Sequence, residues 1–285
     1  MAVCGVLVLC GLVVIALWGG IGYRPPADGG GEAPAEPAHA LAPGLVARRY
    51  VWYLAVAVGS GVGAGILMAG TGGRLAMRLL AVTAGDAAQG RRTEAEEVVG
   101  RITLGGTFGL VVFTALFFGS ATGVLYLVLR RWLPAGRLGG LTYGLLLLVV
   151  AAPRVDPLRA DNPDFDIVGP GWLSLAVFAA LVVAHGMLVV ALAGRYSRAL
   201  PLIGPSPRRV LGYAPVLLLL PLFPVLIAAI ILGGLVVLAT RMSWVAAAVG
   251  SRRTLIAGWA VLALITALSL PGLATAVSEI AAGPG

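Results

Sequence analysis

Apolar runs long enough to form membrane-crossing helices follow one another along most of the sequence, and short polar stretches separate them. A helix needs about 20 apolar residues to cross the ~30 Å hydrocarbon core of a bilayer. The pattern therefore predicts an all-α fold, a polytopic transmembrane helical bundle with about seven membrane helices. The expected segments cover residues 2–21, 50 onward to about 80, 102–129, 138–152, 172–193, 210–240 and 255–270.

The same pattern divides the chain into three regions. Residues 1–22 are expected to form a first transmembrane helix, and residues 23–49 a flexible linker rich in Pro, Ala and Gly. Such a linker has too little apolar surface to order itself, so we expect the first helix to be only loosely tethered. Residues 50–285 are expected to form the helical bundle, with polar loops at 85–101 and 153–171.

Pairs of glycines four residues apart recur in the predicted helices. They occur at Gly59/Gly63 and Gly61/Gly65, and again at Gly105/Gly109 and Gly119/Gly123. Small residues at this spacing let two membrane helices approach closely. We expect these pairs to mark helix-packing surfaces.

The uncharged run 210–240 is too long for one perpendicular crossing. Its 31 residues would span about 46 Å as a helix, and it contains Pro215, Pro221 and Pro224. One long, tilted helix kinked at the prolines is the expected structure. A re-entrant hairpin is the alternative.

Composition agrees with a membrane protein and excludes a water-soluble globular fold. The chain is 59% hydrophobic and 11% charged, against roughly 25% charged residues in soluble domains. All twenty basic residues are arginines, and the formal net charge is +8. Because these arginines stand singly or in pairs at the ends of apolar runs, they indicate membrane topology and not nucleic-acid binding.

The short loops at 130–137 and 195–209 carry arginine without acid, which favours the cytoplasm for both. Alternation then places the acidic loop 153–171 outside. If 210–240 crosses once, ten arginines fall on each side. If that run returns to the side where it started, the distribution becomes thirteen inside against seven outside.

Two short motifs lie within the loop at 85–101. Thr93 and Glu96 fit a capping box, which predicts a helix start at this point. In that helix Glu94, Glu97 and Arg101 would share a face, with Glu97 and Arg101 forming an ion pair.

The polar residues of the two acid-bearing loops are the candidate site, a polar vestibule on one side of the membrane. One interpretation is a hard-cation site made by the loop carboxylates, with Arg74 and Arg78 binding an anionic headgroup. The other is an ordered loop stabilised by Arg–carboxylate pairs, which we favour because the spacing lacks the glycine turn and distal Glu of a calcium loop. The candidates are Arg74, Arg78, Glu94, Glu97, Arg101, Arg154, Asp156, Arg159, Asp161, Asn162, Asp164 and Asp166.

Catalytic patterns are missing from the sequence, which contains no H-E-x-x-H, G-x-S-x-G or G-x-x-x-x-G-K. His185 is the one histidine inside a predicted membrane helix, where an ionisable group suggests a function. A neutral histidine that hydrogen-bonds within the bundle is the preferred interpretation. We predict no catalytic residue and no cofactor.

The stretches 72–80 (GGRLAMRLL), 93–100 (TEAEEVVG) and 156–165 (DPLRADNPDF) resemble a group of multi-pass membrane proteins of high-GC Gram-positive bacteria. The resemblance covers about residues 50–200 and implies no activity. The expected function is that of a non-enzymatic, multi-pass protein of the bacterial plasma membrane. Its polar face would bind an ion, a lipid headgroup or a membrane-protein partner, which includes a second copy of the chain. A small transporter or channel, and an enzyme acting on lipid phosphate, are the alternatives.

Overall fold

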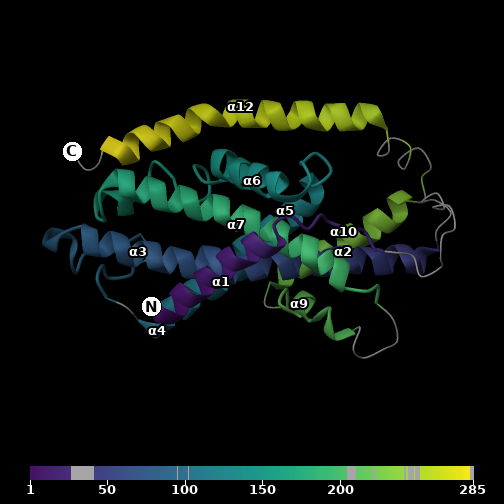
Figure 1. Ribbon diagram of the computed structural model, residues 1–285, viewed down its shortest axis with the longest axis horizontal. Coiled ribbons are helices and arrows are strands. Elements are labelled where there is room, and N and C mark those ends of the chain that lie inside the picture. The colour runs from purple at the N-terminus through teal and green to yellow at the C-terminus, as the bar shows by residue number, and fades with distance from the viewer. Residues whose placement is uncertain are drawn as a thin grey trace.

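The computed structural model describes residues 1–26, 42–94, 96–101, 103–203, 210–220, 222–240, 242, 247 and 251–282. The regular elements of this part of the chain are helices, most of which run along the long axis of the molecule (Figure 1). The α-helices are α1 (Ala2–Trp18), α2 (Pro43–Ala64), α3 (Thr71–Thr83), α4 (Leu104–Phe113), α5 (Ser120–Leu129), α6 (Gly136–Leu146), α7 (Gly171–Ala199), α9 (Ala214–Leu217), α10 (Phe223–Thr240) and α12 (Arg252–Ala282). Segments η2 (Gly65–Gly70), η4 (Thr114–Gly119) and η5 (Leu147–Ala151) are π-helical, and η3 (Asp86–Ala88) and η6 (Pro163–Asp166) are 3₁₀ turns.

Among the described residues, four helices are long and apolar enough to cross a membrane. They are Pro43–Thr83, Leu104–Leu129, Gly171–Ala199 and Arg252–Ala282. The predicted count of about seven is not confirmed, because the other apolar helices, Ala2–Trp18, Gly136–Ala151 and Ile227–Val236, are shorter. The all-α fold is confirmed for the described part of the chain.

The longest helical unit joins α2, η2 and α3 without a break. It begins at Pro43, inside the region predicted as linker, because proline suits the first helical position, where its missing N–H costs no hydrogen bond. Its 41 residues correspond to about 61 Å. Arg74 and Arg78 therefore lie near the end of one long helix.

Small residues hold α2 and η2 directly against η4 and α5. A Cβ atom added to Gly61 would lie 1.9 Å from the carbonyl oxygen of Gly119, and one added to Gly123 would lie 2.0 Å from that of Ala57. The predicted packing role of Gly119/Gly123 is confirmed. It is wrong for Gly105 and Gly109, where an added Cβ would have no neighbour within 4 Å.

Helix α1 packs on the bundle, while residues 27–41 of the predicted flexible linker lie outside the described residues. Gly11 lies against Met68 and Leu188. At the other end of the helix, Arg137 Nη2 donates to the carbonyl oxygen of Ala16 at 2.8 Å. A guanidinium suits this position because the last carbonyls of a helix have no partner inside the helix.

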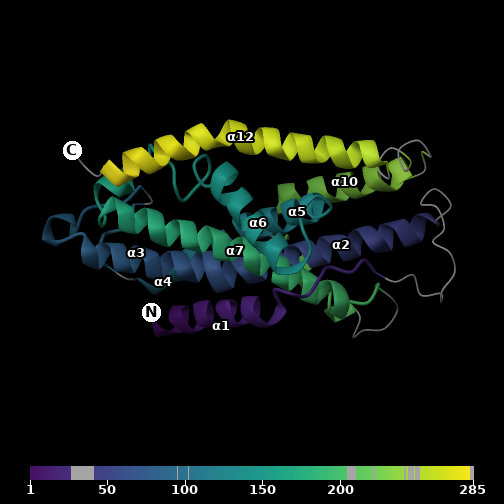
Figure 2. The same ribbon diagram turned by 45° about the horizontal axis from the view of Figure 1, so that its top comes forward.

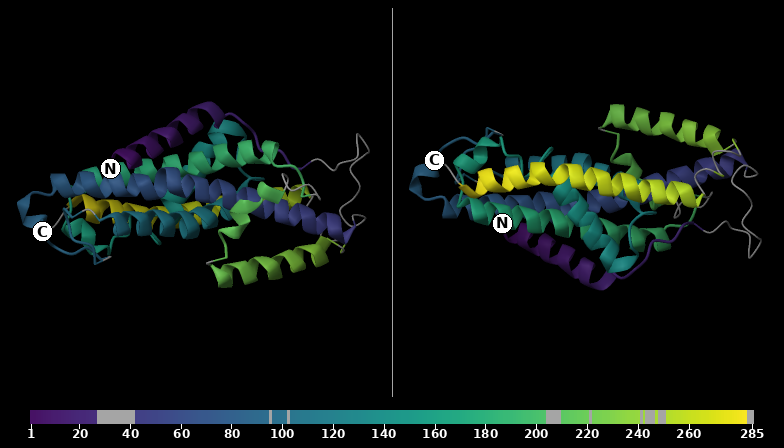
Figure 3. Two further views of the ribbon diagram at one scale, coloured as in Figure 1. Left: turned by 90° about the horizontal axis from the view of Figure 1, so that it is seen from below. Right: turned by 90° about the horizontal axis from the view of Figure 1, so that it is seen from above.

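The run 210–240 forms a hairpin and not one kinked helix. Pro215 packs on Gly59, and Leu219 and Leu222 pack beside Val62. Helix α10 then turns back, so that Tyr50 Oη donates to the carbonyl oxygen of Ala229 at 2.6 Å. Figure 3 shows α10 on the side of the bundle away from α1. The first limb thus runs along α2 from Gly59 to Val62, and the chain then returns to the level of Tyr50.

Helix α12 runs the length of the bundle, as Figure 2 shows. It starts beside Trp132, which lies against Gly258, and ends where Ile280 contacts Gly171. It continues through Pro271, although the sequence predicted an end before that residue. Membrane helices tolerate an internal proline because neighbouring groups or local adjustments satisfy the carbonyl it frees.

The two ends of the bundle differ sharply in charge. We call the end that contains Trp52 and Trp132 the Arg end, and the loops 84–103 and 152–170 at the opposite end the cap. All nine described carboxylates lie in the cap or at the end of α12 beside it. Five arginines lie in the cap, and Arg74 and Arg78 lie on α3 beside it. The Arg end holds the other ten described arginines and no described acid. Arg208, Arg209 and Arg241 lie outside the described residues.

Candidate functional site

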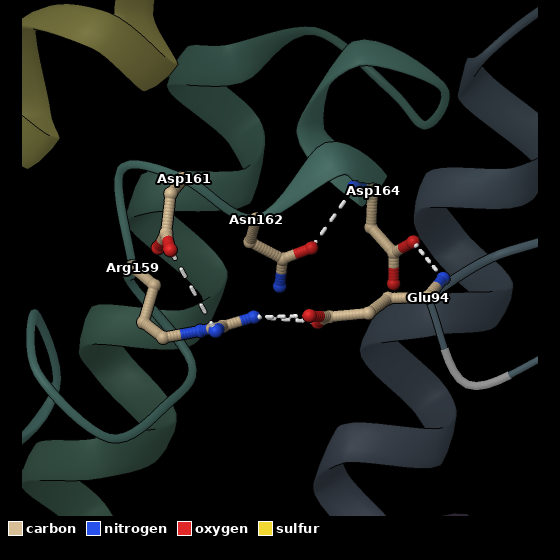
Figure 4. Close-up of polar contacts among 5 residues, drawn as sticks. All are labelled: Glu94, Arg159, Asp161, Asn162 and Asp164. Atoms are coloured by element: carbon tan, nitrogen blue, oxygen red, sulfur yellow. Dashed lines mark hydrogen bonds and ion pairs between the residues drawn. The ribbon is translucent and has the colours of Figure 1, made fainter.

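The two loops of the cap are joined by a cluster of charged side chains. Arg159 Nη2 donates to both carboxylate oxygens of Glu94, at 2.7 and 2.5 Å. Asp164 Oδ1 accepts the backbone N–H of the same glutamate at 2.7 Å. Figure 4 shows that these groups meet between the loops. Glu94 is therefore fixed through its side chain and its backbone at once.

The acidic loop is shaped by its own short-range contacts. Asn162 Oδ1 accepts the backbone N–H of Asp164 at 2.9 Å and so caps the 3₁₀ turn η6. This is the usual role of an asparagine that starts a turn. Asp161 is exposed and reaches Arg159 only at 3.9 Å. Asn162 thus positions Asp164, while Asp161 contributes little.

The capping box predicted at Thr93 does not start a helix. The chain instead turns tightly, with the Glu97 carbonyl accepting the backbone N–H of Thr93 at 2.9 Å and Glu96 in the left-handed region at φ +59°. The helix begins ten residues later, where Thr103 Oγ1 accepts the N–H of Gly106 at 3.0 Å. Antiparallel backbone pairing takes the place of a helix here, because the Val99 N–H donates to the Arg91 carbonyl at 2.9 Å and Arg92 faces Val98. Threonine before an apolar run was the available signal for the true N-cap.

The predicted ion pair between Glu97 and Arg101 is absent from the described ion pairs. The Glu97 carboxylate instead lies against Gly106, at the start of α4. Arg101 is exposed. Because the segment is not helical, the spacing of four residues does not bring the two side chains together.

The remaining vestibule residues do not converge with Glu94. Arg154 Nη1 donates to the carbonyl oxygen of Val150 at 2.8 Å, which places it at the end of its own helix. Asp156 is a partial exception, because burial raises the pKa of its carboxyl and Arg159, Glu94 and Asp164 lie close enough to act on it electrostatically. The exposed Asp166 lines a small pocket with Asn162 and Glu279. The predicted vestibule is thus a clasp of Glu94, Arg159, Asp164 and Asn162, surrounded by solvated charges.

The clasp is a poor cation site. Both oxygens of Glu94 and one oxygen of Asp164 accept N–H donors, so fewer oxygens are left for a metal. Burial raises the pKa of the Asp164 carboxyl above its usual value, and the Glu94 N–H only partly offsets this. No group of three metal-ligating side chains is found within the described residues. The contacts favour the interpretation of an ordered loop stabilised by ion pairs.

Arg74 and Arg78 share the same helix but differ in environment. Arg78 is exposed, whereas Arg74 is 8% exposed and donates from Nε to Thr107 Oγ1 at 3.0 Å. Arg74 Nη2 is buried and has no hydrogen-bond partner among the described residues. Thr107 was not a candidate from the sequence, since nothing there links it to a residue 33 positions away.

His185 is buried where α7 meets α5. Its Nε2 lies 2.9 Å from Thr122 Oγ1. The backbone oxygen of Thr122 accepts a hydrogen bond from Tyr143 Oη at 2.5 Å. Thr122 therefore links three helices, and the contacts agree with a histidine that bonds within the bundle. Neither Thr122 nor Tyr143 carried a signal in the sequence.

Comparison with protein-family models, with curated proteins and with solved structures finds no significant similarity. The function is therefore inferred from the geometry alone.

Proposed function

We propose that this chain is a non-enzymatic, multi-pass protein of the bacterial plasma membrane, with its Arg end in the cytoplasm and its cap in the outer headgroup layer, where it binds lipid headgroups. The charge asymmetry carries this proposal. Ten arginines and no acid at one end, among described residues, match the bias of cytoplasmic loops. The hairpin at 210–240 adds support, because it returns the chain to the Arg end before α12 begins.

Of the three ligand classes expected for the polar face, the contacts favour a headgroup. A cation would compete with Arg159 and with backbone N–H groups for the best-placed oxygens. A headgroup phosphate would meet Arg74 and Arg78, which have no ion-pair partner among the described residues. These two side chains lie four residues apart on one helix face.

Single-cysteine labelling tests the orientation. Both native cysteines, Cys4 and Cys10, would be replaced by serine. Ala160→Cys and Ala281→Cys would report the cap, and Ala135→Cys and Ser251→Cys the Arg end. We expect a membrane-impermeant thiol reagent on intact cells to label the first two only. The reverse pattern, or labelling of both sets, would contradict the proposed orientation.

Lipid preference tests the ligand. The purified full chain in neutral detergent should melt at a higher temperature with added phosphatidylglycerol than with phosphatidylcholine. Equal melting temperatures in the two lipids would contradict headgroup binding. Calcium or magnesium should leave the melting temperature unchanged, and a clear rise would favour the cation interpretation.

A transporter or channel is the second candidate, and the hairpin at 210–240 supports it. Broken membrane segments often line substrate pathways. Ion or solute flux into liposomes that is lost in both His185→Ala and Arg78→Ala would favour this function. Flux unchanged by both substitutions would remove the two residues from a pathway.

A further inference from the structure

We infer that Arg74 and Thr107 form a binding site for a phosphate group, which an anionic lipid presents from the outer headgroup layer. The inference rests on the proposed function and adds to it the atoms that bind the ligand. It depends on the burial of Arg74, on its incomplete hydrogen bonding and on its depth in the bundle.

Arg74 is a buried cation that the described protein groups only partly satisfy. Its guanidinium carries five N–H donors, and one of them is used, by Nε to Thr107 Oγ1. Neither terminal nitrogen has a hydrogen-bond partner in the described part of the chain, and Nη2 is fully buried. A buried charge left in this state is costly, so an anionic ligand would stabilise it.

The depth of Arg74 matches that of a headgroup phosphate. It lies 22 residues after Trp52, which is about 33 Å along a helix and close to the thickness of the hydrocarbon core. Trp52 is buried at the Arg end, at the level of Arg130, whose guanidinium lies over the neighbouring rings of Tyr23 and Tyr53. Arg74 therefore stands where the outer headgroups begin.

The surroundings of Thr107 suit a lipid better than a small soluble anion. Leu104 and Phe108, on the same turns of α4, are 91% and 72% exposed. These apolar side chains would contact acyl chains while the phosphate reaches the guanidinium. Thr107 also lies in the first turn of α4, where the positive end of the helix dipole favours an anion.

Two nearby charges set the affinity of this site. Arg78 lies one turn further along α3 and is exposed, so it can approach the same phosphate from the water side. Glu97 has the opposite effect. Its carboxylate lies against Gly106, next to Thr107, yet forms no ion pair with Arg74 within the described contacts. Glu97 is thus a negative charge that competes with the ligand.

The test compares lipid and soluble phosphate on the full chain in neutral detergent. Native mass spectrometry would count bound short-chain phosphatidylglycerol and phosphatidylcholine, and glycerol phosphate would serve as the soluble probe. Arg74→Gln should weaken phosphatidylglycerol binding about ten- to a hundredfold, the range expected for charge-assisted hydrogen bonds. Arg74→Lys should recover part of it, because it keeps the charge but loses the planar fork. Glu97→Gln should strengthen binding.

Arg78→Gln and Arg91→Gln are the matched controls, since each removes one exposed arginine of the same end. We expect a small loss for the first and none for the second. If Arg74→Gln, Arg78→Gln and Arg91→Gln weaken phosphatidylglycerol binding equally, the lipid is attracted by the overall positive charge of this end. That result would overturn the site. Thr107→Val keeps Arg74 but removes its hydrogen-bond acceptor, so it remains informative if Arg74→Gln misfolds. Unchanged binding in Thr107→Val would also overturn the site.

The outcomes separate this inference from the proposed function. If phosphatidylglycerol binds wild type and Arg74→Gln equally, the cap binds headgroups elsewhere and only the site is wrong. If neither lipid is preferred, headgroup binding itself fails. If glycerol phosphate binds as tightly as the lipid and competes with it, the Arg74 site stands but its ligand is a soluble phosphate.

Discussion

Arg159 donates hydrogen bonds from Nη2 to both carboxylate oxygens of Glu94 and thereby joins residues 65 positions apart in the sequence. The pair is partly shielded, since the two side chains are 25% and 49% exposed. The same glutamate donates its backbone N–H to Asp164. Glu94 therefore links the two loops of the cap, through its side chain to Arg159 and through its backbone to Asp164.

We expect Glu94→Gln and Arg159→Gln each to lower the melting temperature of the purified protein. The double variant should lose little more than either single variant, because both substitutions remove the same interaction. Thermal unfolding in detergent, arranged as a double-mutant cycle, measures this coupling. High salt should reduce it only partly, since partly buried pairs are less screened.

The pair formed by Arg92 and Glu96 is the matched control. It lies in the same loop, with Arg92 Nη1 3.2 Å from Glu96 Oε2. Its two side chains, however, are 66% and 78% exposed. Surface pairs of this kind contribute little to stability. A coupling at Arg92–Glu96 equal to that at Glu94–Arg159 would contradict the role given to the clasp.

Asp164 should make the protein less stable as the pH rises through the acid range. Burial raises the pKa of its carboxyl above 3.8, so the folded state binds this proton more tightly than the unfolded state. The stability from this group is complete below about pH 3.8 and is lost as the pH rises through the raised pKa. Asp164→Asn keeps an acceptor for the Glu94 N–H without the charge. We expect it to equal or exceed wild type at pH 7, within about 1 kcal/mol.

Melting temperatures of wild type and Asp164→Asn between pH 4 and 7 test whether ionisation of Asp164 lowers the stability of the folded protein. The advantage of the asparagine should shrink towards pH 4, where wild type is itself partly protonated. Asp164→Ala is the control, because it also removes the acceptor and should be less stable than Asp164→Asn throughout. An advantage of the asparagine that grows towards pH 4 would refute the assignment.

The sequence predicted the helical membrane class because hydrophobic length is a property of each segment on its own. Apolar runs in 43–83, 104–129, 171–199 and 252–282 form long helices whatever their neighbours. Pro215, Pro221 and Pro224 marked a break in the run 210–240. They did not show whether the chain continues as one kinked helix or turns back as a hairpin. That choice depends on the contacts of Leu219 and Tyr50 with other segments.

The candidate site was harder to predict, because its contacts join distant residues. Asp164 and Asn162 were chosen for their chemistry, and they do shape the cap. The capping box at Thr93 failed because the backbone there pairs with residues 97–99 through a tight turn instead of starting a helix. Thr107 and Thr122 have ordinary sequence contexts, so only the fold shows that they bind Arg74 and His185.

Gly119→Ala and Gly109→Ala should have opposite effects, although the sequence gives both glycines the same four-residue spacing. A Cβ at Gly119 would lie 2.5 Å from the carbonyl oxygen of Gly61, and neither backbone can move easily. We expect this substitution to cost about 3 kcal/mol, at the upper end for overpacking. Gly109→Ala meets open space and should stabilise α4 by about 0.5–1 kcal/mol, the usual gain in a helix.

Unfolding of the two variants in mixed micelles measures the difference. Gly61→Ala should resemble Gly119→Ala, because it presses on the same contact from the other helix. A stable Gly119→Ala variant would show that α2 and η4 do not approach as closely as described.

Thr122→Val should destabilise the bundle by removing the partner of His185 Nε2. Both ring nitrogens would then be unsatisfied, because Nδ1 already has no partner among the described residues. Hydrogen bonds between membrane helices contribute about 0.6 kcal/mol on average and up to ~1.7. We expect a loss near the upper value, because His185 is buried on every side. Thr122→Ser keeps the hydroxyl and should retain most of the stability.

Thr266→Val is the control for the loss of a threonine hydroxyl. Thr266 Oγ1 donates to the carbonyl oxygen of Leu262 in its own helix, so its removal breaks no contact between helices. Replacing both partners, in a Thr122→Val, His185→Leu variant, should cost less than the sum of the single losses, because no polar atom is then left unpaired. If Thr122→Val and Thr266→Val cost the same, and the cycle shows no coupling, the bond between Thr122 and His185 does not stabilise the bundle. His185 would then be free for the transport role, and the flux measurements on His185→Ala would decide between the two functions.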